Sequence, residues 1–299
     1  LDLPRESTST IILGELSEQQ ALGLVLTVLE RTELPPHVAT VILSKGRGNP
    51  LFLEQIAHSM LESGKINQLL STTSLRLAEQ MIALEIPDRV QSLIMSRIDT
   101  LSLTTKETLR TAAVIGGVFS IDALEAVFDP NEEKNTLVDS LEELVQLDFV
   151  HREGDNEGPS YRFKHALIQE VAYDSLLFAR RRMLHHRIAT YFEDTNFDQL
   201  EPFYEILVHH YSGCSNSEKT LLYGVKAAGK ARQVFAHDEA IAYYRRALDA
   251  LSKVGGEAIS QRSYILEHIG DCYEGGGQHV QAARTFYSAL RVWRNDLRH

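Results

Sequence analysis

The feature that most limits the fold is a pattern of small and large residues near the C-terminus. Small residues recur where two antiparallel helices would touch, and large residues recur where side chains would fill the space between them. Seven positions follow this pattern: Leu266, Ile269, Gly270, Tyr273, Ala282, Phe286 and Ala289. The C-terminal end of the chain is therefore predicted to form a pair of packed helices.

The same pattern is typical of tetratricopeptide repeats, and it recurs upstream. A second copy is marked by Ala227, Ala228, Ala231, Ala240, Tyr244 and Ala247. The two copies are spaced more widely than the roughly 34 residues of an ideal repeat, and a linker through Gly255-Gly256 accounts for the extra length. Because each repeat buries its apolar face on a neighbour, we expect the array at 218–299 to continue past His299, with Trp293 packed on the next helix. A helical hairpin of no particular family is the alternative.

Residues 1–83 are predicted to form a small helical bundle followed by a polar connection. Ser17 and Gln20 have the spacing of a capping box in front of an amphipathic helix. A second apolar run precedes the break at Gly48-Asn49-Pro50, and a third helix follows as far as Ser63. The apolar residues keep a helical period throughout this region.

Residues 84–180 are predicted to form a winged-helix domain, because three helical segments are followed by a β-hairpin. Pro87 suits the first turn of the first helix, and a capping box that begins at Thr104 is expected to start the second. Alternating runs at 149–152 and 161–164 flank a loop rich in Gly, Asp and Asn. The change from a helical period to alternation indicates the wing.

Residues 181–217 are predicted to be helices that link the winged helix to the repeats. The run Arg180-Arg181-Arg182 is expected to be a solvated junction between two of these helices. The predicted fold class is therefore mainly α. It consists of a helical bundle, a winged-helix domain with a small β-hairpin, and an α-solenoid of tetratricopeptide-like hairpins.

The charge of the chain argues against a nucleic-acid partner. Lys and Arg total 30 against 41 for Asp and Glu, a net charge of −11, whereas binding to nucleic acid normally needs a basic face. A winged helix can read DNA through its recognition helix, which would be the segment 137–147. This segment carries Asp139, Glu142 and Glu143 and no basic residue, so phosphates would repel it. We expect it to pack against another domain instead.

The two cysteines and the lack of long apolar runs indicate a cytoplasmic setting. Cys214 and Cys272 are too few and too far apart for a disulfide framework, which points to a reducing compartment. No run of about 18 apolar residues suits insertion into a membrane. The start at Leu1 has no signal-peptide pattern, and we expect that it lies within a longer protein.

The sequence has no loop of the form G-x-x-x-x-G-K-[ST], whose backbone N–H groups cradle phosphates. Gly64-Lys65 and Gly229-Lys230 lack the upstream glycine and the following Ser or Thr. Nor does an apolar strand end in paired acids that would hold magnesium. The chain itself is therefore not expected to be an enzyme or to hydrolyse ATP.

Two pairs of adjacent histidines raise the question of a metal site. His185-His186 and His209-His210 each lie in a predicted helix. Adjacent residues on a helix point about 100° apart, so neither pair is expected to chelate one ion as an i, i+4 pair would. His209 and Tyr211 are expected to cap a helix end, and no metal site is predicted.

Two other residues have a local context that suits a ligand. Pro50 makes the turn before a helix rigid. His165 lies between the second wing strand and a helix N-terminus, where an imidazole and the free N–H groups of the first turn would face an anion. Taken alone, each also has a plain explanation, as a turn residue and as a structural histidine.

Several segments together resemble a known family. These are Gly48–Glu54 (GNPLFLE), Ile86–Gln91 (IPDRVQ), Arg97–Asp99, Phe163–Tyr173 (FKHALIQEVAY) and His185 with Ile188-Ala189. They resemble the STAND class of predicted signal-transduction ATPases. This class is related to the AAA+ enzymes and is often fused to adenylyl or guanylyl cyclases, kinases or transcription regulators. The resemblance covers nearly the whole chain.

In that class a nucleotide-binding core precedes a helical lid, a winged helix and a repeat sensor. The resemblance implies that residues 1–83 contain the lid and that the full-length protein binds ATP or ADP, neither of which should bind tightly to this chain alone. It implies that Pro50 contacts the base or sugar and that His165 approaches the phosphates in the closed state. Related proteins have an apolar residue before this histidine, where this chain has Lys164.

The resemblance also implies two partners. One is the upstream nucleotide-binding core, and the other is a protein or small-molecule inducer that binds the repeats. The chain would then be the sensing and gating part of a nucleotide switch. The alternative is a non-catalytic helical-repeat scaffold that holds protein partners and senses no nucleotide.

Overall fold

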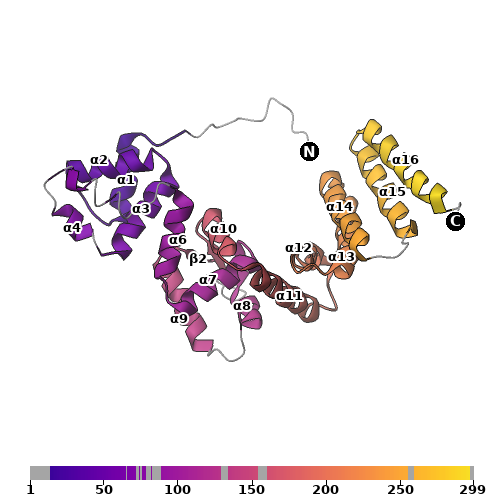
Figure 1. The fold of residues 1–299 in the computed structure, drawn as a ribbon, viewed down its shortest axis with the longest axis horizontal. Coiled ribbons are helices and arrows are strands. Elements are labelled where there is room, and N and C mark those ends of the chain that lie inside the picture. Colours follow the sequence, from indigo (N-terminus) through magenta and orange to yellow (C-terminus); the bar gives the residue numbers. More distant parts are fainter. Residues whose placement is uncertain are drawn as a thin grey trace.

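The computed structural model is mainly α-helical, and its helices follow one another along an arc (Figure 1). The structure describes residues 14–64, 66–71, 74, 76–78, 82, 89–128, 134–153, 160–254 and 259–296. Within these ranges one small antiparallel sheet lies near the middle of the chain, and helical hairpins fill the C-terminal part. The predicted fold class is confirmed.

The N-terminal bundle consists of α1 (Glu18–Val28), α2 (Pro36–Gly46), α3 (Pro50–Glu62) and the short α4 (Ile66–Leu70). Ser17 and Gln20 form the predicted capping box at the start of α1. Val25, Ile42 and Ile56 are completely buried at its centre. The amphipathic period seen in the sequence therefore marks the faces that pack together.

The central part has the order of a winged helix. Its elements are α6 (Val90–Thr100), α7 (Leu103–Ile115), β1 (Val118–Ser120), α8 (Ile121–Val127), α9 (Lys134–Gln146), β2 (Val150–Glu153), β3 (Ser160–Phe163) and α10 (Ala166–Asp174). The strand order is β1-β3-β2, with both pairs antiparallel. Val150 lies opposite Phe163 in the predicted hairpin, and Phe119 of β1 is buried against the same core.

Two details of this region differ from the sequence-based expectation. Strand β1 was not predicted, because three residues are too few to show an alternating pattern. Helix α7 starts at Leu103 and is capped by Ser102, whose hydroxyl accepts a hydrogen bond from the backbone N–H of Thr105. The capping box expected at Thr104 was therefore wrong, since that residue is already inside the helix. Pro87 lies outside the described residues.

The linking helices are α11 (Phe178–Thr195) and α12 (Tyr204–Gly213), with a 3-10 turn η2 (Glu201–Phe203) between them. Arg180-Arg181-Arg182 lie in the first turn of α11, so the predicted helix junction was wrong. Arginine has a high helix propensity, and Arg181 also donates from Nη2 to the carbonyl of Asp174, 2.7 Å away. The charged run therefore lies inside the helix, and Arg181 ties this helix to α10.

The C-terminal part is formed by α13 (Ser217–Gln233), α14 (His237–Val254), α15 (Ile259–Gly275) and α16 (His279–Asp296). Each helix packs on the next, and α13 with α14 and α15 with α16 form the closest pairs. Ala228, Ala240 and Tyr244 are buried between them. A Cβ atom added at Gly270 would lie 2.4 Å from the ring of Phe286, so the small residue permits the close approach of α15 and α16.

Candidate functional site

The turn that precedes α3 is tightly held. Arg47 and Gly48 adopt the left-handed backbone conformation, with φ of 47° and 69°. The side chain of Asn49 caps α3 by accepting a hydrogen bond from the backbone N–H of Phe52 (3.0 Å), and Pro50 occupies the first helical turn, where a missing N–H costs nothing. The carbonyl of Gly48 accepts a hydrogen bond from the N–H of Leu16 (2.9 Å). The Gly48-Asn49-Pro50 segment therefore holds the start of α3 in a fixed position.

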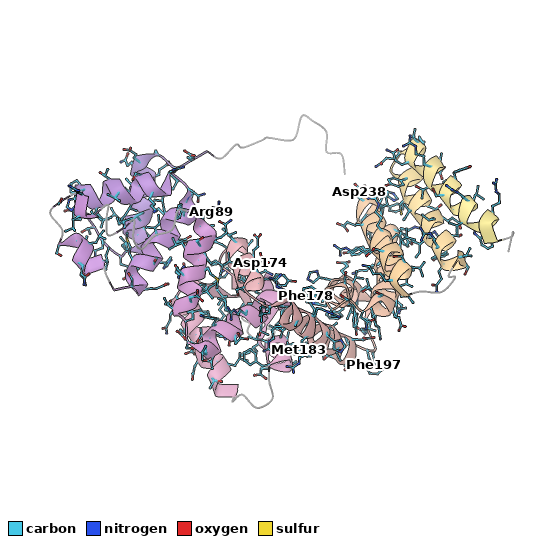
Figure 2. The ribbon with its side chains drawn as sticks, in the orientation of Figure 1. Arg89, Asp174, Phe178, Met183, Phe197 and Asp238 are labelled. Carbon is cyan, nitrogen blue, oxygen red and sulfur yellow. The ribbon has the colours of Figure 1, made fainter. Side chains whose placement is uncertain are left out.

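A pocket of about 530 Å³ lies beside this turn. It is lined by Glu15, Ser44, Lys45, Gly46, Arg47, Asn49, Phe52 and Arg89. Arg89 precedes the first turn of α6 and is labelled in Figure 2. Three basic side chains and one carboxylate give the lining a positive net charge, and Phe52 adds an aromatic surface. This combination suits a ligand that carries both a phosphate and a flat base.

His165 lies at the N-cap of α10, where its side chain makes no capping hydrogen bond. Its Nε2 atom lies 2.7 Å from Oε2 of Glu54. Glu54 is on α3, one helical turn after Pro50, so the contact joins the Gly48–Glu54 segment to the Phe163–Tyr173 segment. The two candidate residues from the sequence therefore belong to segments that meet in the structure.

Charged neighbours surround this contact. Lys164 lies 3.1 Å from a carboxylate oxygen of Asp148 and 3.9 Å from Glu54. Nε2 of His58, on the same face of α3, lies 3.2 Å from Oδ2 of Asp148, although the atoms are not aligned for a hydrogen bond. Burial lowers the pKa of His58, and the nearby guanidinium of Arg97 lowers it further. The contacts between the winged helix and the N-terminal bundle thus involve titratable side chains.

Arg97 is the residue of this junction whose role the sequence did not reveal. Its side chain is 1% exposed and donates to Gln55 (2.5 Å), to Glu62 and to the carbonyl of Leu147 (2.7 Å). It also stacks over the ring of Phe149, 4.6 Å from the centroid. One cation of α6 therefore connects α3 with the end of α9. A buried arginine is rare unless it is paired, but its partners are distant in sequence.

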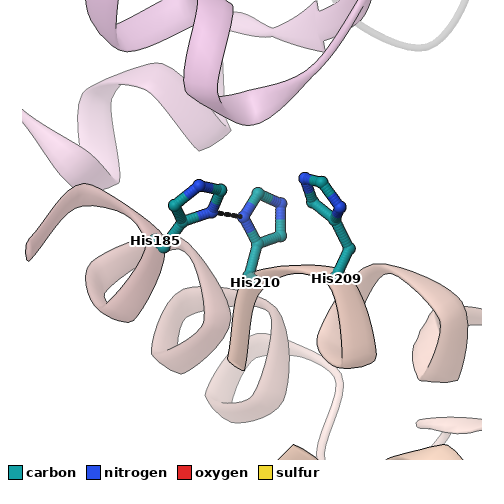
Figure 3. A group of neighbouring side chains, drawn as sticks. All are labelled: His185, His209 and His210. Carbon is teal, nitrogen blue, oxygen red and sulfur yellow. Dashed lines mark hydrogen bonds between the residues drawn. The ribbon is translucent and has the colours of Figure 1, made fainter. Parts of the chain in front are cut away.

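A second group of titratable residues lies between α11 and α12 (Figure 3). His185, His209 and His210 come together there, with Nδ1 of His185 and Nδ1 of His210 2.9 Å apart. Adjacent histidines on one helix point apart, whereas the contact between His185 and His210 forms between two helices. The expected capping role was also wrong, because His209 and Tyr211 lie inside α12 and Tyr211 donates to Glu193 instead.

Among the described residues, no helix is both long enough and apolar enough to cross a membrane. No family model matches the chain. The chain is 30% identical over 143 residues to an uncharacterized protein of Rhizobium meliloti (strain 1021), a match that covers 48% of this chain and 13% of that protein. The chain thus spans a small part of the curated relative that it matches.

A search of solved structures finds similarity to a Signal Transduction ATPase with Numerous Domains (STAND) protein with a tetratricopeptide repeat sensor from Pyrococcus horikoshii. The sequences are 12% identical, and the TM-score is 0.42. The alignment covers 98% of this chain and 56% of that chain.

Proposed function

We propose that this chain is the sensing and gating part of a nucleotide-switched signal-transduction ATPase of the STAND class. In this proposal the winged helix holds or releases a nucleotide that is bound by a core preceding the chain. The repeats of α13 to α16 bind the inducer or protein partner. The family resemblance of the Gly48–Glu54 and Phe163–Tyr173 segments supports the proposal.

The contact between His165 and Glu54 is the observation that carries this proposal. The two residues are far apart in sequence, and each belongs to a segment that carries the family resemblance. Their 2.7 Å contact brings the wing against the helix that Pro50 starts. A gate needs such a contact, because the wing must lie next to the nucleotide in one state and apart from it in another.

The charges at this contact suggest how the gate works. A phosphate brought to His165 would compete with Glu54 for the same imidazole, since both are anionic acceptors. Closure on ADP therefore requires His165 to exchange the carboxylate of Glu54 for a phosphate. The pocket beside the turn, with Lys45, Arg47 and Arg89 on its wall, supplies further positive charge for the ligand.

The test uses the longer protein that contains this chain together with the preceding core. His165→Ala removes a hydrogen bond of roughly 0.5–3 kcal/mol between the wing and ADP, so ADP release should accelerate by about two-fold to a hundred-fold. Glu54→Gln removes the competing charge and should slow ADP release. Release of a fluorescent ADP analogue, measured by stopped flow, gives both rates.

His151→Ala is the matched control, because this histidine lies on the adjacent wing strand β2 and its side chain is 43% exposed. It should release ADP at the wild-type rate. Equal rates for wild type and His165→Ala, in a variant that melts like wild type, would make His165 a structural residue. A longer protein that binds no nucleotide at all would favour the alternative, a scaffold that only holds partners.

A further inference from the structure

The three histidines between α11 and α12 form a compact cluster (Figure 3). His185 and His210 are each 1% exposed, whereas His209 is exposed to solvent. One ring nitrogen from each histidine lies within 4.8 Å of one from each of the others. Because His185 comes from α11 and the other two from α12, an ion bound to all three would join the two helices.

Gly213 makes the approach of the two helices possible. A Cβ atom at this position would lie 2.6 Å from two ring atoms of His185, closer than real contacts allow. The backbone of α12 therefore packs directly on the imidazole. This packing fixes the position of His185 beneath the last turn of α12.

The outer nitrogen of the His185 ring is engaged by another polar group. Nε2 of His185 lies 3.0 Å from the hydroxyl of Tyr173. Metal-binding histidines are usually oriented in this way, with the second ring nitrogen held by a polar group.

Nδ1 of His185 and Nδ1 of His210 share a hydrogen bond of 2.9 Å, in which one ring nitrogen donates to the other. A metal ion binds a neutral imidazole through the ring nitrogen that carries no proton. An ion coordinated by both Nδ1 atoms would therefore take the place of the proton between them, and that proton would move to Nε2 of its own ring.

A route for an ion is present. A pocket of about 340 Å³ opens onto the cluster, and His209, His210 and Glu205 are among its lining residues. Glu205 precedes His209 by four residues on α12, so the two side chains share one helix face. The pocket leaves room for water to complete the coordination of an ion held by imidazoles.

We propose that His185, His209 and His210 form a binding site for a divalent late first-row transition-metal ion, with zinc as the representative. Imidazole ligands favour such ions. With bonds of about 2.0–2.1 Å, two nitrogens on a tetrahedral zinc ion lie roughly 3.3 Å apart. The 2.9 Å pair would therefore open by about 0.4 Å, and the two rings would turn so that both nitrogens point at the ion. The exposed His209 is free to turn its ring toward the ion. The ion would lock α12, and the repeats that follow it, to α11.

The experiment is a zinc titration of the 299-residue chain after removal of metals with a chelator. Calorimetry should show one equivalent of zinc bound, with a melting temperature that rises on binding. Cobalt(II) in place of zinc should give the intense visible absorption of a four-coordinate site. His209→Ala should weaken zinc binding by about tenfold or more. Since His209 is exposed, this variant should fold like wild type without metal.

Two control variants test whether zinc binds at this cluster and not elsewhere on the chain. His186→Ala removes an exposed histidine that is adjacent to His185 on α11. Glu54→Gln alters a second group of side chains that could hold an ion, formed by Glu54, His58 and Asp148. Both should bind zinc like wild type. The proposal is overturned if His209→Ala binds zinc as tightly as wild type, or if the cobalt spectrum is the weak one of an octahedral ion.

Discussion

The junction between the N-terminal bundle and the wing is held together differently from the C-terminal repeats. At the junction, charged side chains meet across three helices, as Arg97 does with Glu62 and His165 does with Glu54. In the repeats, small residues such as Ala240 and Gly270 let the helices touch, and large apolar residues fill the space. The first region therefore depends on polar partners and the second on shape.

The two regions should respond differently to a ligand. Ion pairs and charged hydrogen bonds respond to protonation and to competing anions, so a polar junction can be rearranged by a ligand. A close-packed helical hairpin is held mainly by contacts between apolar and small residues, and it changes little until it unfolds. In the proposed function, the polar junction would therefore act as the gate and the close-packed repeats as a rigid binding surface.

The largest effect should come from removing the buried cation of the junction. Arg97→Met keeps much of the volume but leaves Glu62 and Gln55 without their partner in a buried site. Breaking one side of a buried ion pair costs about 3–5 kcal/mol. We expect the bundle and wing to melt at a markedly lower temperature, as followed by far-UV circular dichroism.

Lys106→Met is the matched control, because Lys106, on the neighbouring helix α7, pairs with the exposed Asp99 of α6. An exposed pair contributes at most about 1 kcal/mol. The single tryptophan, Trp293, lies on α16 and reports on the repeats alone. If Arg97→Met shifted the Trp293 transition as much as the dichroism transition, the two regions would unfold as one unit and the contrast between them would be lost.

An intermediate effect is expected from a change of shape in the repeats. Gly270→Leu places a side chain where the ring of Phe286 already lies 2.4 Å from an added Cβ atom. Overpacking of this kind costs about 1–3 kcal/mol and should separate α15 from α16. The Trp293 fluorescence transition should move to lower temperature while the junction is unaffected.

Gly229→Leu supplies the comparison for this change. Gly229 lies within α13, and an added Cβ atom would meet nothing within 4 Å. Leucine has a higher helix propensity than glycine by about 0.5–1 kcal/mol, so this variant should be unchanged or slightly more stable. A Gly270→Leu protein with wild-type fluorescence melting would contradict the close approach of α15 and α16.

The sequence predicted the parts of the molecule that rest on local patterns. The spacing of Gly270 and Phe286 predicted a close helical contact, and Ser17 with Gln20 predicted the start of α1 correctly. In both cases the residues that form the pattern are close in sequence. Such a pattern predicts which face of a helix packs against its neighbour, and the structure confirms the predicted faces.

The sequence could not predict contacts between distant segments. Arg97 belongs to a segment that carries the family resemblance, but no neighbouring residue in the sequence indicated that it would contact Gln55 and Leu147. Likewise, His185 reaches His210 only because α11 and α12 pack together. Side chains that meet across the fold have no fixed sequence spacing. The roles of Pro50 and His165 in binding a nucleotide stay predictions.

The smallest effect concerns the response of the junction to acid. Burial, and then Arg97, lower the pKa of His58, and these causes outweigh the opposing influence of Asp148, Glu54 and Glu62. In the unfolded chain a histidine has a pKa of about 6.5. Below that pH the unfolded state binds the proton more readily than the folded state. The stability that His58 contributes is therefore complete above about pH 6.5 and is lost as the pH falls toward its folded pKa.

His58→Gln should remove this part of the acid response. The melting temperature of the wild-type junction, followed by circular dichroism, should fall more steeply than that of His58→Gln between about pH 7 and pH 5. His186→Gln, at an exposed position of α11, should keep the wild-type slope. The Trp293 transition should show the same pH dependence in all three proteins, because His58 does not belong to the repeats. If the melting temperatures of wild type and His58→Gln, followed by circular dichroism, had the same dependence on pH, burial of His58 would have no effect on the stability of the junction.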